Sequence, residues 1–450
     1  MKTSSSQNKK NYFDNLPILS KEEALNILAK PIDQLELSSD YYKAVFHLFK
    51  YPAPDTEKAL LSLAESNSSV HSVVIAKRKA IEVLGRHGCV NAIPAIGRCL
   101  ASSDPYLVEN AAWSLKELAC TDRYLIKHIL RLIDDPKQNR RVLIQSLGTL
   151  GGVAELSRLK LFSEDTRLPP GVRGASIAAV KKLSGESDQI NELVNYLSLP
   201  NQNQRQCAVN DIIDAGATDL LDFILKSPVA PSFRMRALNI LWPKNLESIN
   251  GLDLFSAIDL LVTDDPNNLE NLGDYPTIME DSYHIQELLN TDFRRSYLSL
   301  KILIKMDPDD IWMTLSKYIH KIKIDYGGLY FLMILFRSVS GWNEDALVEI
   351  KAITRSCLGS NWPEFMKFKP AAILTLMQLE PETAVGLVPK WLDESTTPFW
   401  ASRYATLIAL EKLMKNDKSF ILHSSVLSNR NDTHRFVDAK IRDMELKFYI

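Results

Sequence analysis

The sequence KAIEVLGRHG at residues 79–88 returns in a related form as NAAWSLKELA at residues 110–119. In both stretches a small apolar residue is followed, one helical turn later, by a large apolar residue. The same frame occurs again at residues 143–147, 176–180, 208–212 and 237–241. The large residues that close the frames stand 31, 32, 33, 32 and 29 positions apart. A period of this length, with two helical stretches in each unit, predicts an α-solenoid whose helix pairs bury their apolar faces by stacking.

Helix-breaking residues separate the two helices of each unit. SSDP at residues 102–105 and DDP at residues 134–136 place a proline in the first turn of a helix, where its missing N–H costs nothing. PPG at residues 169–171 has the same role in a later unit. An Asp-Pro turn, an arginine or polar residue and then an alanine-rich helix is typical of HEAT-like repeats. The expected fold is therefore all-α, a HEAT-like superhelix of antiparallel helix pairs.

The strength of the repeat pattern divides the chain into four parts. Residues 1–15 are expected to be a disordered tail, and residues 16–53 are expected to form helices that cap the solenoid. Regular repeats are predicted for residues 54–243. Residues 244–450 are predicted to hold divergent helical repeats, an acidic insertion at residues 264–281 and a C-terminal cap.

The composition argues against several classes of function. The formal net charge of −2 gives no general attraction to nucleic acid or to an anionic membrane. No uncharged apolar run is long enough for a membrane span, and the N-terminus lacks the apolar segment of a signal peptide. The five cysteines are scattered and the eight histidines are dispersed, so no metal site is expected. This sparse use of cysteine indicates free thiols in a reducing cytoplasm.

Cations recur near the start of the predicted second helices, which are expected to line the concave face of the solenoid. Reading that position along the array gives Lys77, Arg78, Arg140, Arg141, Arg173, Arg205, Arg234 and Arg236, interrupted by Glu109 and Asn110. In HEAT-like units such an arginine often pairs with an aspartate of a neighbouring unit, and this structural role is the first interpretation for any one of them. As a row, the arginines would suit a ligand with carboxylates, because guanidinium binds carboxylate in a fixed bidentate geometry.

Trp113 stands in the same array, on one helical face with Asn110 and Glu117. Tryptophan in a solenoid usually belongs to the core. The alternative is that its flat ring stacks on a conjugated ligand. Asp211 adds a carboxylate further along the array.

The chain contains no catalytic motif of the hydrolase, P-loop or dinucleotide-binding kinds. Its protonatable candidates are His87, His284, Tyr318 and His320. A lone histidine carries little weight as a catalytic group, and a core or surface position is favoured for Tyr318 and His320.

Several longer strings resemble the E/F-type phycobilin lyases of cyanobacteria. They are DPYLVENAAWSL at 104–115, DDPKQNRRVLIQSL at 134–147, QRQCAVNDIIDAGA at 204–217, SPVAPSFRMRAL at 227–238 and TDFRRSYL at 291–298. The resemblance is clear over about residues 17–340 and looser beyond them. As a single long polypeptide, the chain looks most like the phycoerythrin branch of that family.

This resemblance implies that the protein attaches phycoerythrobilin, through a thioether bond, to a cysteine of an apo-phycoerythrin subunit, the α-subunit in that branch. Some members of the branch also isomerise the bilin to phycourobilin, and a lyase-isomerase is slightly favoured here. The bilin would be the substrate, with no permanently bound cofactor, and the location would be the cyanobacterial cytoplasm. The alternative is a non-enzymatic HEAT-repeat scaffold or an assembly chaperone for phycobilisome proteins.

The resemblance also gives the row of polar residues a purpose. Arginines suit the two propionates of a bilin, a carboxylate suits its pyrrole N–H groups, and an aromatic side chain suits its conjugated rings. The predicted bilin-binding residues are Glu109, Asn110, Trp113, Arg140, Arg141, Arg205 and Arg234. The predicted acid/base groups are Glu117, Asp211, Tyr318 and His320.

Overall fold

The computed structural model describes residues 19–186, 188–249, 251–274, 279–359, 368–416 and 431–448. These residues form helices and connecting segments, and their only β-type pairing is an isolated bridge between Ile249 and Leu252. The expected all-α solenoid is confirmed. The predicted tail at residues 1–15 lies outside the described residues. The chain divides into two compact units, unit 1 up to Ile190 and unit 2 from Asn191.

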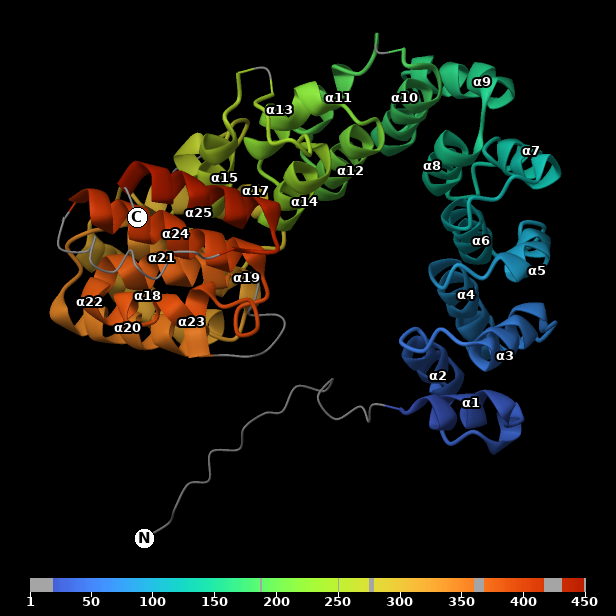
Figure 1. Cartoon of the computed structure of the whole chain (residues 1–450), viewed down its shortest axis with the longest axis horizontal. Coiled ribbons are helices and arrows are strands. Elements are labelled where there is room, and N and C mark those ends of the chain that lie inside the picture. Colours follow the sequence, from blue (N-terminus) through green and yellow to red (C-terminus); the bar gives the residue numbers. More distant parts are fainter. Residues whose placement is uncertain are drawn as a thin grey trace. The chain divides into compact units, whose positions relative to one another are not determined.

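The described part of unit 1 is a stack of helix pairs (Figure 1). The first helices are α1 (Lys21–Ala29), α3 (Pro54–Glu65), α5 (Ile93–Cys99), α7 (Arg123–Leu132) and α9 (Val153–Glu164). The second helices are α2 (Asp40–Leu48), α4 (His71–Arg86), α6 (Pro105–Glu117), α8 (Arg140–Leu150) and α10 (Pro170–Ser184). Each second helix packs on the next one along the chain, so that the second helices form one continuous layer.

Local sequence signals set the helix starts in unit 1. Ser20 and Glu23 form a reciprocal capping box, in which each side chain accepts a hydrogen bond from the backbone N–H of the other residue. Asp104 caps α6 by accepting from the N–H of Tyr106, and Pro105 occupies the first helical position. The helix start predicted at the Asp-Pro turn of residues 104–105 is confirmed, whereas α8 begins at Arg140, beyond the Asp-Pro turn of residues 135–136.

Small residues let neighbouring second helices approach closely. A Cβ atom at Gly85 of α4 would lie 2.8 Å from the Cβ of Ser114 in α6. A Cβ atom at Gly148 of α8 would lie 2.9 Å from the Cβ of Ala179 in α10. Both distances are shorter than carbon atoms tolerate. Small residues next to the large residues that close the repeat frame therefore set the spacing of the second-helix layer.

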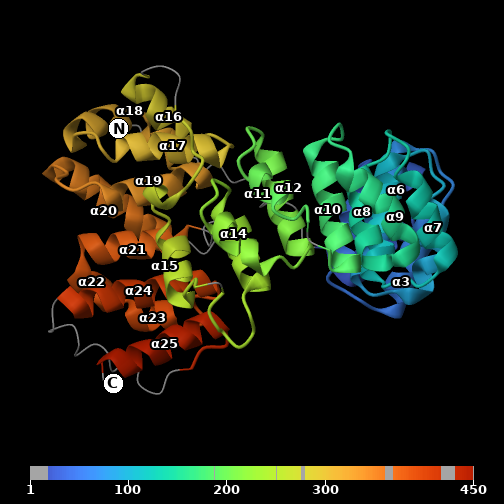
Figure 2. The ribbon, with the colours of Figure 1, turned by 90° about the horizontal axis from the view of Figure 1, so that it is seen from above.

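Unit 2 continues with less uniform helices (Figure 2). It begins with α11 (Glu192–Tyr196), α12 (Gln202–Asp214), α13 (Leu221–Leu225), α14 (Pro231–Leu241) and α15 (Leu254–Thr263). It continues with α16 (Asp281–Glu287), α17 (Phe293–Leu303), α18 (Pro308–Ile322), α19 (Tyr326–Ser338), α20 (Glu344–Gly359) and α21 (Lys369–Leu379). It closes with α22 (Pro381–Val385), α23 (Val388–Leu392), α24 (Trp400–Asn416) and α25 (Arg435–Phe448). The consecutive packing of α17, α19, α21 and α24 repeats the layering of unit 1.

The predicted acidic insertion follows α15. Its described residues, 264–274 and 279–281, contain one short 3-10 turn at Pro266–Asn268 before α16 begins. Residues 275–278 lie outside the described residues. None of the helices in the described ranges has the length and apolar character needed to cross a lipid bilayer.

Candidate functional site

Trp113 lies half-buried on α6, with a cation above its ring from each of two helices. The guanidinium carbon of Arg86 in α4 is 5.0 Å from the ring centroid, and Nζ of Lys116 in α6 is 5.7 Å from it. Lys116 reaches the ring because it stands one helical turn after Trp113. Cations at this distance are attracted by the negative face of an indole ring. Trp113 therefore combines an aromatic face with positive charge at the surface of unit 1.

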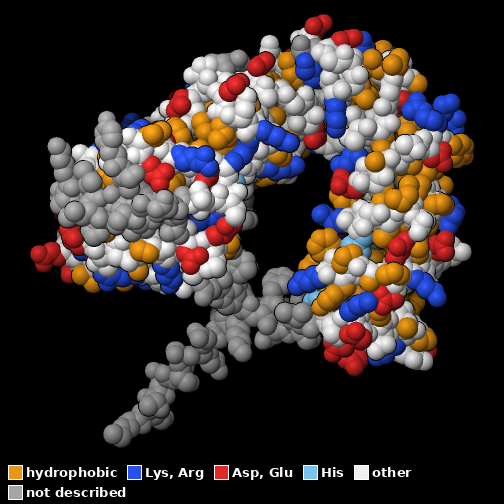
Figure 3. All heavy atoms as spheres, viewed as in Figure 1, with side chains coloured by type: hydrophobic (Ala, Val, Ile, Leu, Met, Phe, Trp, Pro, Cys, Tyr) orange, Lys and Arg blue, Asp and Glu red, His pale blue; other side chains and the backbone are white. Residues whose placement is uncertain are grey.

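Two exposed phenylalanines of the α2 region extend this surface. The guanidinium of Arg86 is also 5.8 Å from the ring centroid of Phe49, and Nζ of Lys79 is 5.8 Å from that of Phe46. The imidazole of His87 stacks on Phe49 at 6.1 Å, and its Nε2 lies 2.9 Å from the backbone oxygen of Phe49. Hydrophobic, basic and histidine side chains lie side by side over α2 and α4 (Figure 3). We call this surface the aromatic–basic strip, made of Phe46, Phe49, Lys79, Arg86, His87, Trp113 and Lys116.

Carboxylates hold the cations of the strip in place. Glu82 of α4 accepts hydrogen bonds from Lys79 at 2.8 Å and from Arg86 at 2.9 Å. Burial raises the pKa of Glu82, but the hydrogen bonds from the two cations outweigh burial and the net pKa is lowered. Glu117 of α6 pairs with Lys116 at 3.0 Å. The strip thus has carboxylates beside its cations and rings.

The remaining candidates of unit 1 lie on α6 and α8. Glu109 and Asn110 are half-buried on α6, and Glu109 accepts a hydrogen bond from the side-chain amide of Asn139. Arg141 donates to the backbone oxygen of Gly171 at 2.6 Å. The guanidinium of Arg140 is half-exposed and has no side-chain partner among the described residues. Arg140 is therefore the candidate arginine of unit 1 with a guanidinium available to a ligand.

Arg205 and Arg234 have a different environment. Both side chains are 0 % exposed. Arg205 donates to the backbone oxygens of Leu199 and Pro200 at 2.7 and 2.8 Å and forms an ion pair with Asp292. A bound bilin could not reach this guanidinium without breaking those contacts.

Arg234 occupies the centre of a buried polar cluster. It donates to Asp264 at 2.8 Å and to the hydroxyl of Tyr297, and Asp264 also accepts from the hydroxyls of Tyr297 and Tyr330. These contacts correct the bilin-binding prediction for Arg205 and Arg234, because both guanidinium groups already serve structural ion pairs. We leave the two residues out of the proposed site.

Pairing of an arginine with an aspartate about one repeat later recurs along the chain. Arg78 donates to Asp104 at 2.7 and 2.9 Å, and Arg403 donates to Asp432 at 2.6 and 2.8 Å. The structural alternative weighed from the sequence therefore applies to Arg78 and Arg234 of the row of cations.

The predicted acid/base groups of unit 2 differ in how deeply they are buried. Asp211 is buried within α12 at 1 % exposure. On α18, Tyr318 is half-buried and its hydroxyl accepts from Gln286 at 3.5 Å, whereas His320 is exposed. His284 is buried in contact with Ser299, and burial lowers its pKa. These four residues belong to unit 2, whereas Trp113 and Glu117 belong to unit 1.

The sequence analysis did not identify five strip residues as ligand-binding candidates: Phe46, Phe49, Lys79, Arg86 and Lys116. The candidates from the sequence came from the starts of the second helices. Arg86 ends α4 and Phe49 follows α2, so neither lies at such a start. The available signal was helical spacing, since Lys79, Glu82 and Arg86 stand three and four residues apart on one face. The contacts across α2, α4 and α6 were not readable from the sequence.

The described residues contain no group of His, Cys, Asp and Glu side chains suited to a metal ion. Cys89, Cys99, Cys120 and Cys357 are buried free thiols. Burial raises the pKa of Cys89 to about 11 and that of Cys357 to about 12. These two thiols are therefore held in the weakly nucleophilic protonated form at neutral pH.

Comparison with known proteins identifies relatives along nearly the whole chain, although no family model matches it. The chain is 33% identical over 421 residues to the bilin biosynthesis protein CpeY of Synechococcus sp. (strain WH8020), covering 92% of this chain and 99% of that protein. It is 29% identical to an uncharacterized phycocyanin operon protein Y of Pseudanabaena tenuis, covering 90% of this chain and 96% of that protein. A phycocyanobilin lyase subunit alpha of Picosynechococcus sp. is 25% identical over 257 residues, covering 51% of this chain and 93% of that subunit. The chain therefore belongs to the family of the bilin biosynthesis protein CpeY, within the bilin lyases.

Proposed function

We propose that the protein attaches phycoerythrobilin through a thioether bond to a cysteine of the α-subunit of apo-phycoerythrin. The kinship with the bilin biosynthesis protein CpeY and with a phycocyanobilin lyase subunit supports a bilin as the substrate. The free cysteines fit work in the reducing cytoplasm of a cyanobacterium.

The aromatic–basic strip is the observation that carries the proposal. A bilin is an open-chain tetrapyrrole with conjugated rings, two propionates and several ring N–H groups. Trp113 supplies a ring face, and the half-exposed Arg140 supplies a guanidinium without a partner in the described structure. Glu117 and Glu82 supply carboxylates that suit pyrrole N–H groups. Glu109, Asn110 and Arg141 are proposed to complete the bilin contacts on α6 and α8.

The attachment reaction needs no nucleophile from this chain. The thiolate of the acceptor cysteine forms a new S–C bond with the ethylidene carbon of the bilin, and the thiol proton ends on the conjugated system. Sulfur and hydrogen are added across a double bond, and no group leaves. The protein accelerates this addition by holding the two reactants together and by managing one proton. Glu117 is proposed to orient the bilin and to pass that proton.

Co-expression with phycoerythrobilin-synthesising enzymes and the apo-α-subunit tests the proposal. A lyase gives a subunit whose colour survives denaturation, whereas a scaffold or assembly chaperone leaves the denatured subunit colourless. Phycocyanobilin and an apo-phycocyanin subunit form the parallel experiment. Attachment only in that second pair would refute the phycoerythrobilin assignment while keeping the lyase activity.

Isomerisation to phycourobilin is a separate proposal, because it moves a double bond out of conjugation. A proton must leave one carbon and reach another, so an additional acid/base group is needed beside the bilin. Tyr318, His320 and His284 are the candidates, whereas Asp211 is a candidate for protonating or orienting the bilin during attachment. The absorption spectrum of the purified coloured subunit tests this proposal, and the absence of a blue-shifted phycourobilin band would refute it.

A further inference from the structure

Exposed large apolar side chains recur in unit 1 where a second helix is followed by the first helix of the next pair. Phe49 follows α2, Val90 precedes α5, Tyr124 is the second residue of α7, and Val153 is the first residue of α9. These residues are 46, 62, 72 and 87 % exposed. A large exposed apolar side chain therefore stands at each of four successive junctions. We call these four residues the junction row.

The four junctions lie along the same edge of the helix stack, because the helices of unit 1 alternate in direction. Contacts join the first junction to the second and the third to the fourth. Nε2 of His87 lies 2.9 Å from the backbone oxygen of Phe49, and Arg123 at the start of α7 donates to Glu155 near the start of α9 at 3.1 Å. Neighbouring helices pack about 8–10 Å apart, so the junction row extends over roughly 24–30 Å.

The two middle junctions share one turn conformation. Gly88 after α4 and Ala119 after α6 both have a positive φ, of 70° and 48°. The next residues, Cys89 and Cys120, donate their backbone N–H to the last turn of the preceding helix at 3.1 and 3.0 Å. This is the left-handed turn that often ends a helix. Its repetition places the starts of α5 and α7 at equivalent positions of the stack.

The apolar character of the junction row departs from what its helix positions favour. Tyr124 and Val153 occupy the first turns of α7 and α9, where acidic side chains are favoured by the helix dipole. Both side chains point into solvent, so packing of the repeats does not require them. Scattered exposed apolar residues are normal, but a continuous apolar surface marks a contact site. Tyrosine is also enriched among the residues that dominate protein–protein contacts.

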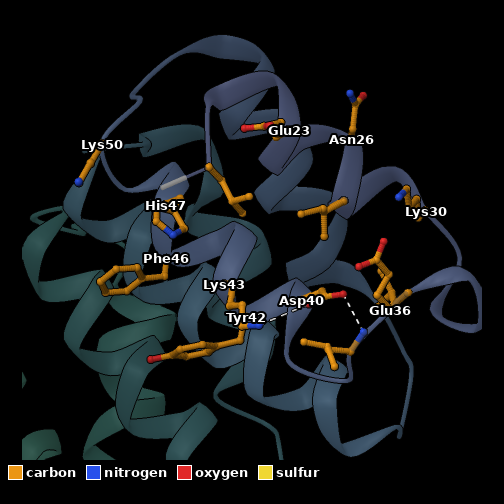
Figure 4. Close-up of a pocket in the computed structure, with 14 residues that line it drawn as sticks. Glu23, Asn26, Lys30, Glu36, Asp40, Tyr42, Lys43, Phe46, His47 and Lys50 are labelled. Carbon is orange, nitrogen blue, oxygen red and sulfur yellow. Dashed lines mark hydrogen bonds and ion pairs between the residues drawn. The ribbon is translucent and has the colours of Figure 1, made fainter. Parts of the chain in front are cut away.

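The junction row is continuous with the aromatic–basic strip. Phe49 belongs to both, and Phe46 of the strip projects from the last turn of α2 (Figure 4). In the proposed reaction the sulfur comes from a cysteine of another protein, and that protein must lie against the strip during transfer. An apolar surface that begins at the strip is suited to hold it there.

We propose that the junction row is the docking surface for the apo-α-subunit of phycoerythrin, the protein that carries the acceptor cysteine. An apolar face of the subunit would pack on Tyr124 and Val153, and its cysteine would face the strip. This inference rests on the proposed bilin lyase function and adds the surface that receives the second reactant.

Binding of the purified apo-α-subunit to the immobilised full-length chain, in the absence of bilin, tests this surface. Tyr124→Glu/Val153→Glu should raise the dissociation constant by about tenfold or more, because a carboxylate buried in an apolar contact loses its water. Glutamate suits the first turn of a helix, so this row variant should fold normally. Tyr124→Phe/Val153→Ile keeps the apolar surface and should bind like the parent chain.

The matched control is Val70→Glu/Leu161→Glu. These two residues are 45 and 55 % exposed and lie near the opposite ends of the helices, before α4 and in the last turn of α9. The control should bind the apo-α-subunit like the parent chain. In transfer assays the row variant should raise the KM for the apo-α-subunit by a similar factor, with kcat and the titration of free bilin unchanged.

Four results would overturn the inference. The first is unchanged binding of the apo-α-subunit by the row variant, with folding verified by circular dichroism. The second is an equal loss of binding in the control. The third is a loss of bilin binding by the row variant, which would make the row part of the bilin site. The fourth is the absence of apo-α-subunit binding by the parent chain. Failure of the lyase proposal is separate, because it is read from the colour of the co-expressed subunit.

Discussion

Two arginines of the second helices lie in contrasting environments. Arg234 is fully buried and donates to Asp264, whereas Arg86 is exposed and lies over the rings of Phe49 and Trp113. Burial decides the difference, because a guanidinium removed from water needs a carboxylate and filled donor sites. The exposed cation keeps its water and can exchange it for a ligand.

Replacement of the buried arginine should therefore be costly for stability. Arg234→Ala leaves the carboxylate of Asp264 buried without its cation, and we expect the free energy of unfolding to fall by about 3–5 kcal/mol. Denaturant unfolding measures this change. Arg86→Ala, at an exposed cation of unit 1, should cost about 1 kcal/mol or less. Equal losses for the two variants would contradict the structural assignment of Arg234.

Replacement of the strip tryptophan should affect the ligand more than the fold. Trp113→Ala removes the ring face between Arg86 and Lys116, and we expect bilin transfer to fall by about tenfold, as for a lost aromatic or cation–π contact of 1–1.5 kcal/mol. Trp113→Phe keeps a ring and should retain most of the transfer. Initial rates of subunit colouring measure both variants. A Trp113→Ala chain that is normally folded and fully active would remove Trp113 from the site.

Neighbouring second helices approach closely at glycine positions where an added methyl group would have no space. Gly85 meets Ser114, whose hydroxyl donates to the backbone oxygen of Ile81 at 2.9 Å, and Gly148 meets Ala179. Each pair joins consecutive second helices. Alanine would favour the helical state of the isolated segment but would force these helices apart.

Gly148→Ala tests which effect dominates. Alanine gains about 1 kcal/mol of helix propensity, but its Cβ would lie 2.9 Å from another Cβ, and overpacking typically costs 1–3 kcal/mol. We expect a net loss of stability in thermal unfolding. Gly359→Ala is the matched control, because no atom of the described residues lies within 4 Å of its added Cβ. That control should be neutral or slightly stabilised, and the opposite order would refute close packing of α8 on α10.

The contact between α24 and α25 should depend on pH. The ring of His434 stacks on Trp400 at 4.5 Å, and burial lowers the pKa of His434 to about 4, with Asp432 opposing and Arg403 and Arg435 reinforcing the shift. Between about pH 6.5 and pH 4 the unfolded chain therefore binds a proton that the folded chain does not. The free energy of unfolding should decrease as the pH falls through this window.

His434→Phe keeps a ring against Trp400 and removes the titration. We expect its stability to fall less between pH 6.5 and pH 5 than that of the parent chain, as measured by denaturant unfolding at each pH. The control is His320→Phe, at an exposed position of α18. Its free energy of unfolding should change with pH as that of the parent chain does. If the free energy of unfolding of His434→Phe also changes with pH like that of the parent chain, His434 does not titrate differently in the folded and unfolded states.

The whole molecule consists of two units, each with its own hydrophobic core. One core runs from Ala24 to Val180, and another from Leu269 to Ala372. In a solenoid each repeat contacts its neighbours only, so stability is distributed locally along the chain.

Hydrogen exchange should reveal this locality. Arg234→Ala should speed amide exchange in α14, α17 and α19, whose residues form or adjoin the cluster around Asp264. Exchange in α4, α6 and α8 should stay at the parent rate. Mass spectrometry of peptides from the two units measures both effects, and a uniform increase along the whole chain would show one cooperative unit instead.

The sequence by itself determined the architecture of this protein. The period of about thirty residues and the Asp-Pro turns are local signals, because each helix start depends on residues within one turn of it. The helix start at Asp104 and Pro105 was readable for that reason. The alternative of arginine–aspartate pairing was also readable, since the Arg78–Asp104 spacing approximates one repeat.

Tertiary structure alone decided which polar residues remain at the surface. Arg140 and Arg205 begin second helices in similar strings, but packing exposes the first and encloses the second beside Asp292. Likewise, Phe49, Arg86 and Trp113 come from three consecutive second-helix regions and meet only after those helices stack. Contacts between residues far apart in the chain decide which side chains are exposed and which side chains meet. No local sequence pattern encodes these contacts.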